Sequence, residues 1–117
     1  MRVTQQQKQL FADQLCVLVM RTFFHAYFMH KHGMTEEELL IDYDIKAAGF
    51  NIDKHVAHTC RTTIKSAVQA VDQGVPYATA CQYLRTPLRV RIDQLFKNKR
   101  LARSFVRDSI CHAMSQD

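Results

Sequence analysis

The sequence predicts an all-helical fold, a compact bundle of five or six helices around a long hydrophobic N-terminal helix, and a single domain over residues 1–117. Two observations favour this fold class. The chain holds only 3 glycines and 2 prolines, and each lies where a run of apolar residues at helical spacing stops. Apolar residues make up 47% of the sequence, enough for one core that needs no metal or disulfide.

The N-terminal helix is expected to run from a cap at Thr4 to about His32, because Gly33 suits the left-handed conformation that follows many helices. Asp13 and Arg21 interrupt its apolar stretch, so we expect no membrane insertion. Such a helix must be buried on more than one side, either by the rest of the chain or by a second copy in a homodimer. Its apolar residues cover most of its circumference: Phe11, Leu15, Leu18, Phe23, Phe24, Tyr27 and Phe28.

A capping box is expected at the start of the second helix. In this motif the side chains of Thr35 and Glu38 each accept a hydrogen bond from the backbone N–H of the other residue. This helix reaches about Ala48, and Gly49 marks its end. It carries the acidic segment, which comprises Glu36, Glu37, Glu38, Asp42 and Asp44.

The third helix is expected to begin at a cap on Asn51 or Asp53 and to stop at Gly74. One apolar stripe follows its length, at Val56, Cys60, Ile64, Ala67, Val68 and Val71. On another face lies the central basic ridge, which consists of Lys54, His58, Arg61 and Lys65.

Prolines delimit the expected C-terminal helices. Pro76 begins a short fourth helix that ends near Leu84, and Thr86 with Pro87 begins a fifth. A last helix is expected over residues 99–114. This part of the chain holds the C-terminal basic region: Arg85, Arg89, Arg91, Lys97, Lys99, Arg100, Arg103 and Arg107.

The charge distribution is strongly asymmetric. The whole chain carries 16 basic and 11 acidic residues, a net +5. Residues 85–107 hold eight basic residues against one acid, a net +7, which leaves eight basic and ten acidic residues elsewhere, a net −2. A basic surface of this kind suits a polyanion, because each neutralised phosphate releases condensed counterions. The alternative is that these are ordinary solvated helix faces, or that the acidic segment pairs with one of them.

Two stretches approach a helix-turn-helix, in which a supporting helix and a tight turn precede a helix that reads the major groove. In the first, residues 35–48 support, residues 49–51 turn and the helix from Ile52 reads; its supporting helix is acidic, which phosphates would repel. The second covers residues 77–97 with a turn at residues 85–87. Its charge is more suitable, although its turn lacks glycine.

No motif specifies a reaction, so we expect no enzymatic activity, no cofactor and no metal site. His55 and His58 lie one helical turn apart, but Cys60 belongs to the apolar stripe and cannot complete a metal site with them. Ser109 and His112 have the residue types of an acyl-transfer triad without its geometry.

The prediction from these patterns is a small DNA-binding regulator of transcription that uses the C-terminal basic region with help from Lys54, Arg61 and Lys65; DNA is favoured over RNA. The alternative is a protein–protein interaction module that inhibits or adapts a protein or ribonucleoprotein through the acidic segment or a basic ridge. A cytoplasmic location is expected, because the N-terminus lacks a signal peptide and the cysteines have no paired spacing: Cys16, Cys60, Cys81 and Cys111.

Overall fold

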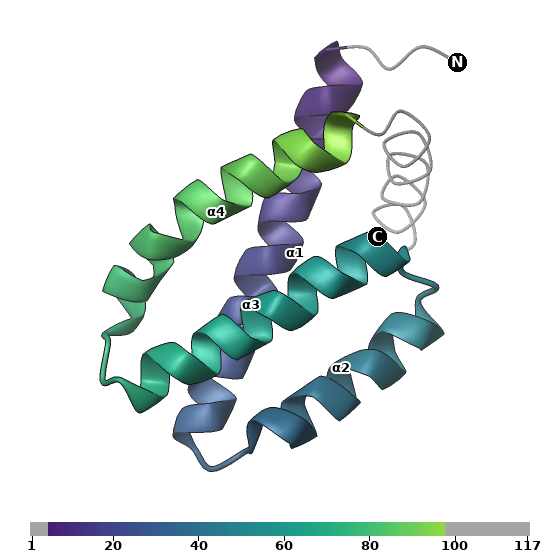
Figure 1. Cartoon of the computed structure of the whole chain (residues 1–117). Coiled ribbons are helices and arrows are strands. Elements are labelled where there is room, and N and C mark those ends of the chain that lie inside the picture. Colours follow the sequence, from purple (N-terminus) through teal and green to yellow (C-terminus); the bar gives the residue numbers. More distant parts are fainter. Residues whose placement is uncertain (1–4, 98–117) are drawn as a thin grey trace.

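The structure is a computed structural model that describes residues 5–97, and these residues form four α-helices and no strand (Figure 1). The helices are α1 (Gln5–Lys31), α2 (Glu36–Gly49), α3 (Lys54–Asp72) and α4 (Tyr77–Lys97). The predicted all-helical fold is thus confirmed. The Thr4 cap and the helix expected over residues 99–114 lie outside the described residues.

The turn between α1 and α2 follows the predicted local signals. Gly33 adopts a left-handed φ of 111°, which a residue with a Cβ rarely tolerates. The Thr35 hydroxyl then accepts a hydrogen bond from the backbone N–H of Glu38 at 3.1 Å, and the Glu38 carboxylate accepts one from the backbone N–H of Thr35 at 3.4 Å. The capping box is confirmed, and it stabilises the start of α2.

Of the two expected caps of α3, the structure shows Asp53, whose carboxylate accepts a hydrogen bond from the backbone N–H of His55 at 2.8 Å. The turn before it differs from the expectation in one detail. Asn51 takes the left-handed conformation, with φ 56°, while Gly49 remains in the last turn of α2. Asparagine tolerates this conformation better than most residues, so it provides the turn that the glycine was expected to provide.

The number of helices expected in the C-terminal part was wrong. The fourth and fifth helices are one continuous helix, α4, with Pro87 inside it. An internal proline costs about 3 kcal/mol because it removes a backbone hydrogen bond. Leu84, Leu88 and Ile92 continue one stripe across the proline and pack against the core, where Leu88 and Ile92 are each only 8% exposed. Burying two such side chains contributes about 1.5–3 kcal/mol each, which offsets the cost.

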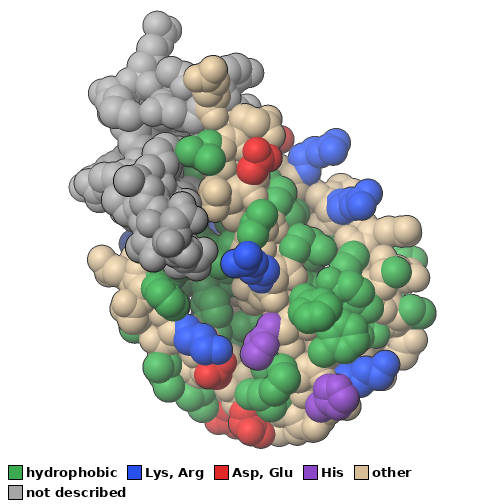
Figure 2. All heavy atoms as spheres, turned by 180° about the vertical axis from the view of Figure 1, so that it is seen from behind, with side chains coloured by type: hydrophobic (Ala, Val, Ile, Leu, Met, Phe, Trp, Pro, Cys, Tyr) green, Lys and Arg blue, Asp and Glu red, His purple; other side chains and the backbone are tan. Residues whose placement is uncertain are grey.

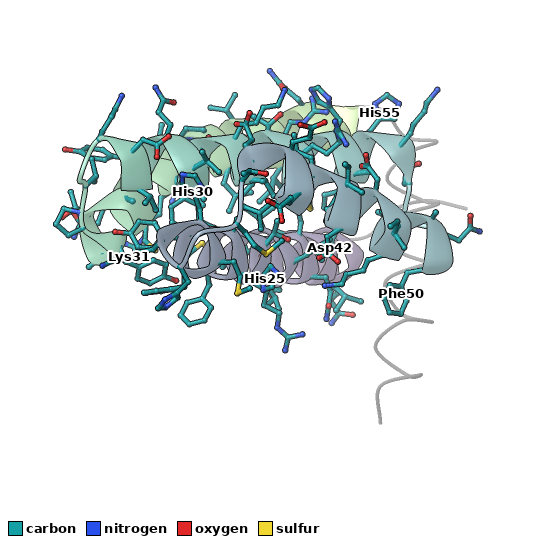
Figure 3. All side chains as sticks on the ribbon, turned by 90° about the horizontal axis from the view of Figure 1, so that it is seen from below. His25, His30, Lys31, Asp42, Phe50 and His55 are labelled. Carbon is teal, nitrogen blue, oxygen red and sulfur yellow. The ribbon has the colours of Figure 1, made fainter. Side chains whose placement is uncertain are left out.

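The continuity of α4 removes one candidate helix-turn-helix, because its expected turn at residues 85–87 lies within a helix. The other candidate corresponds to α2 and α3. These helices run side by side in opposite directions, as Figures 1 and 3 both show. A helix-turn-helix instead needs two helices that cross steeply, so the described residues show a helical hairpin at this place.

The core lies between α1 and the other three helices. At one end it contains Phe11, Leu15 and Val19 of α1, packed against α3 and α4. The other end holds a second cluster from all four helices: Phe23, Ala26, Tyr27, Leu39, Ile64, Ala67, Val68 and Ala80. The predicted apolar stripe of α3 is buried from Val56 to Val68, as expected. One side of α1 is therefore covered by its own chain.

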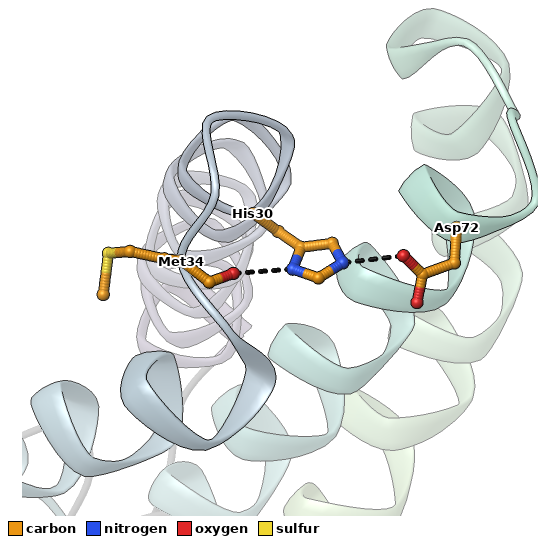
Figure 4. A network of polar contacts seen from close by, with 3 residues as sticks. All are labelled: His30, Met34 and Asp72. Atoms are coloured by element: carbon orange, nitrogen blue, oxygen red, sulfur yellow. Dashed lines mark hydrogen bonds and ion pairs between the residues drawn. The ribbon is translucent and has the colours of Figure 1, made fainter.

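A polar clasp joins the ends of α1 and α3 (Figure 4). The ring of His30 places Nδ1 2.7 Å from the carbonyl oxygen of Met34 and Nε2 2.7 Å from the carboxylate of Asp72. The hydrogen bond to Asp72, and then that to Met34, raise the pKa of His30 above its usual value. This clasp ties the turn after α1 to the last turn of α3.

None of the helices within residues 5–97 is long and apolar enough to cross a membrane. Cys16, Cys60 and Cys81 carry free thiols. Cys111 lies outside the described residues.

Candidate nucleic-acid interface

An open groove of about 740 Å³ runs between α3 and α4. Its floor is α1, which contributes Val19 and Phe23 beneath the two helices. Figure 1 shows this arrangement, with α3 and α4 in front and α1 behind them. The groove exists because α3 and α4 each bury one face on α1, while their neighbouring faces are left apart.

The two walls of the groove are formed by stripes at helical spacing. The wall from α3 is polar and comprises His58, Thr62, Ser66, Gln69 and Gln73. Its hydroxyl groups donate to the helix itself, since Thr62 bonds to the carbonyl of His58 at 3.0 Å and Ser66 to that of Thr62 at 3.1 Å. The donors of this wall that remain after these bonds are therefore the side-chain amides and the histidine ring. The wall from α4 is mixed and comprises Tyr83, Pro87, Val90, Arg91 and Gln94.

Tyr83 and Val90 are exposed to an unusual degree for large apolar side chains, at 72% and 51%. Pro87, between them, is exposed as well. These three residues are spaced by four and three positions, so they lie along one line on the continuous helix α4. An exposed aromatic ring beside a polar wall can stack on a planar ligand such as a nucleobase.

Arg91 crosses from α4 to α3. Its Nε donates a hydrogen bond to the Thr59 hydroxyl at 3.0 Å, and its Nη1 donates one to the amide oxygen of Gln94 at 3.4 Å. These contacts hold the guanidinium at the groove in a fixed orientation. Arg91, which was predicted from charge alone, is thus half-buried and lines the groove.

The described residues that line the groove include no carboxylate, whereas they do include Arg91 and His58. Lys54 and Lys65 are exposed on α3, on the same side of this helix as His58, and add their positive charge to that of Arg91. Lys54, His58 and Lys65 share one side of the helix at spacings of four and seven residues. The electrostatic environment of the groove therefore favours an anion.

Arg61 belongs to the same predicted ridge but has a partner within the chain. Its Nη1 forms an ion pair with the carboxylate of Asp44 on α2. A second acid of the same segment, Asp42, pairs with Lys46 at 2.9 Å. For Arg61, the acidic segment thus pairs with the central basic ridge, which was the alternative to binding of a polyanion. Glu38 is likewise engaged in the capping box, and Glu36 and Glu37 complete the segment.

The C-terminal basic region does not lie on one described surface. Arg85 and Arg89 are exposed on α4, but they lie two residues from Tyr83 and Pro87 and so face another side of the helix. The backbone of Lys97 ends α4. The remaining members of the region lie outside the described residues: Lys99, Arg100, Arg103 and Arg107.

Sequence reasoning missed the apolar part of the groove, above all Tyr83 and Val90. The expected break at Pro87 assigned these two residues to different helices, so their common face was not recognised. An uninterrupted helical wheel over residues 77–97 reveals it, because Tyr83, Pro87, Val90 and Gln94 then form one stripe.

Residues 5–97 contain no group of three or more potential metal ligands. Burial raises the pKa of the Cys60 thiol, and burial together with the charge of Asp13 raises that of Cys16, so neither is an activated thiolate. Ser109 and His112 lie outside the described residues.

Comparison with known proteins adds no assignment: no family model matches the chain, no curated protein matches it, and no solved structure matches it.

Proposed function

We propose that this protein binds DNA in the groove between α3 and α4. The observation that carries the proposal is the groove itself, whose described lining holds Arg91, His58 and polar amides but no carboxylate. Phosphates would lie along α3 at Lys54 and Lys65, where each neutralised charge releases counterions. The biological role that we propose for this DNA binding is regulation of transcription.

The groove favours an unpaired strand over a duplex. A duplex is too wide to enter a space between two adjacent helices, and a base can stack on Tyr83 only when it is unpaired. The backbone of a single strand can instead follow the exposed face of α3 while a base reaches the ring of Tyr83. This mode of binding replaces the helix-turn-helix that the sequence suggested.

The proposal is tested by fluorescence anisotropy with labelled oligonucleotides of equal length, single-stranded and double-stranded, over a range of salt concentrations. Two to three phosphate contacts from the described residues predict a loss of roughly sevenfold to twentyfold in single-strand affinity between about 50 mM and about 200 mM salt. Absence of binding to any DNA or RNA at low salt would sink the proposal.

Substitutions then locate the site. The variant Lys65→Glu is expected to weaken binding severalfold, while Lys31→Glu, the same change in charge on α1, leaves it unchanged. Tyr83→Ala is expected to cost about 1–3 kcal/mol of binding free energy, and Tyr83→Phe much less because the stacking face is kept. Equal effects of Lys65→Glu and of Lys31→Glu would mean that only net charge matters.

A second candidate function, recognition of a protein partner, has its own supporting observation. Ile41 and Ile45 are 54% and 69% exposed on the outer face of α2, within the acidic segment. Exposed apolar residues bordered by acids suit a partner with an apolar and basic surface. In this case a cross-linker placed on α2 would capture one defined partner protein in cells. The double variant Ile41→Ser with Glu37→Lys would abolish that cross-link and leave the DNA affinity unchanged.

A further inference from the structure

The side of α1 that faces away from the other helices carries apolar side chains spaced by seven residues. Leu10, Val17 and Phe24 therefore lie along one line of the helix. Val17 is 48% exposed and Phe24 is 53% exposed. Figure 2, which views the molecule from the side opposite to Figure 1, shows hydrophobic side chains gathered on this face with basic side chains around them. We call this surface the α1 seam.

Neighbouring aromatic residues hold one end of the α1 seam in place. The ring of Phe24 lies 4.8 Å from that of Phe28 and meets the ring of Tyr77 edge-on at 5.6 Å, measured between ring centroids. Tyr77 also contacts Phe28 at 5.2 Å. Phe24 thus presents a large apolar surface at a small further cost in side-chain entropy, which favours its use as a contact residue.

The charges beside the α1 seam are arranged symmetrically about Val17. Asp13 lies four residues before Val17 and Arg21 four residues after it, and both are exposed. The carboxylate of Asp13 also accepts a hydrogen bond from the side-chain amide of Gln9 at 2.8 Å, which restricts its orientation. One helix therefore carries opposite charges at equal distances from the centre of its apolar line.

This symmetry matches an antiparallel pair of α1 helices related by a two-fold axis beside Val17. In such a pair each residue faces the one that lies equally far beyond Val17 on the other copy. Asp13 then faces the partner's Arg21, Leu10 faces the partner's Phe24, and Val17 packs against the partner's Val17. A parallel pair would instead place Asp13 opposite the partner's Asp13 and Arg21 opposite the partner's Arg21, which is unfavourable.

We infer that the protein forms an antiparallel homodimer through the α1 seam, centred on Val17 and oriented by two reciprocal ion pairs between Asp13 and the partner's Arg21. The seam and the groove lie on opposite sides of α1: Val19 and Phe23 form the floor of the groove and are buried, whereas Val17 and Phe24 of the seam are exposed. Dimerisation therefore leaves both grooves open, and it does not depend on the proposed function.

The test measures the molar mass of the full chain, without nucleic acid, by sedimentation equilibrium from micromolar to near-millimolar concentration. The unaltered protein is expected to associate to a dimer, and Val17→Glu to remain a monomer with an unchanged circular dichroism spectrum, because Val17 is half exposed and not part of the core. A monomer at all concentrations would overturn the inference.

Charge reversal distinguishes the orientation. Asp13→Arg alone and Arg21→Asp alone are each expected to weaken dimerisation roughly tenfold, because each turns two attractive pairs into two repulsive ones. The double variant Asp13→Arg with Arg21→Asp restores the attraction and thereby the affinity. Dimerisation that is insensitive to the single reversals, or double variants that fail to recover, would contradict the antiparallel arrangement.

Discussion

The clasp at His30 predicts a stability that depends on pH in a defined direction. Both ring nitrogens face acceptors, the carbonyl of Met34 and the carboxylate of Asp72, each at 2.7 Å. A neutral imidazole has one N–H and can donate to only one of them, so the protonated ring satisfies both. The hydrogen bond with Asp72 is the largest cause of the raised pKa of His30, followed by that with Met34; the charges of Asp72 and Glu36 add to it, and burial opposes it.

Because the folded pKa of His30 is raised above about 6.5, the clasp stabilises the fold fully below that pH and loses this contribution as the pH rises through the folded pKa. The side chain of His30 is 18% exposed and that of Asp72 is 63% exposed. We therefore assign up to about 1 kcal/mol to the exposed ion pair and about 1 kcal/mol to the charged bond with Met34. His30→Gln is expected to lower Tm by roughly 10 °C at acidic pH.

The assay is thermal unfolding followed by circular dichroism from about pH 5.5 to about pH 9. The difference in Tm between the unaltered protein and His30→Gln should shrink as the pH rises, and Asp72→Asn should move that change to lower pH. His25→Gln, which replaces an exposed histidine of the same helix, serves as the control and should follow the unaltered protein. A difference between the two proteins that stays constant with pH would refute the role assigned to the charged ring.

Two further predictions concern α4 and the acidic segment. Pro87→Ala restores a backbone donor within a continuous helix and is expected to stabilise the fold by about 1–2 kcal/mol in urea unfolding, after allowance for the greater flexibility of the unfolded chain. A loss of stability would indicate that a break at Pro87 is needed. Asp44→Asn removes the partner of Arg61 and is expected to increase DNA affinity severalfold in the anisotropy assay. The effect should vanish in the double variant with Arg61→Gln.

The C-terminal half shows why part of the candidate site was not predictable. A proline after threonine is a strong local signal for a new helix, and it was overruled because Leu84, Leu88 and Ile92 continue to pack on α1 and α3 through it. Once the helix is continuous, Tyr83 and Val90 face the same groove. The ion pair of Arg61 with Asp44 depends in the same way on which face of α2 meets α3.

The sequence by itself determined the helical class, the cap at Thr35, the turns at Gly33 and Gly74, and the buried stripe of α3, and it narrowed the cap of α3 to Asn51 or Asp53. These features depend on φ preferences, on hydrogen bonds between residues a few positions apart and on apolar periodicity, all of which can be recognised along one segment. Tertiary structure alone decided the continuity of α4, the groove between α3 and α4 and the pairing of charges. The physical reason is that each of these depends on contacts between helices far apart in the chain, whose packing energy exceeds the local preference.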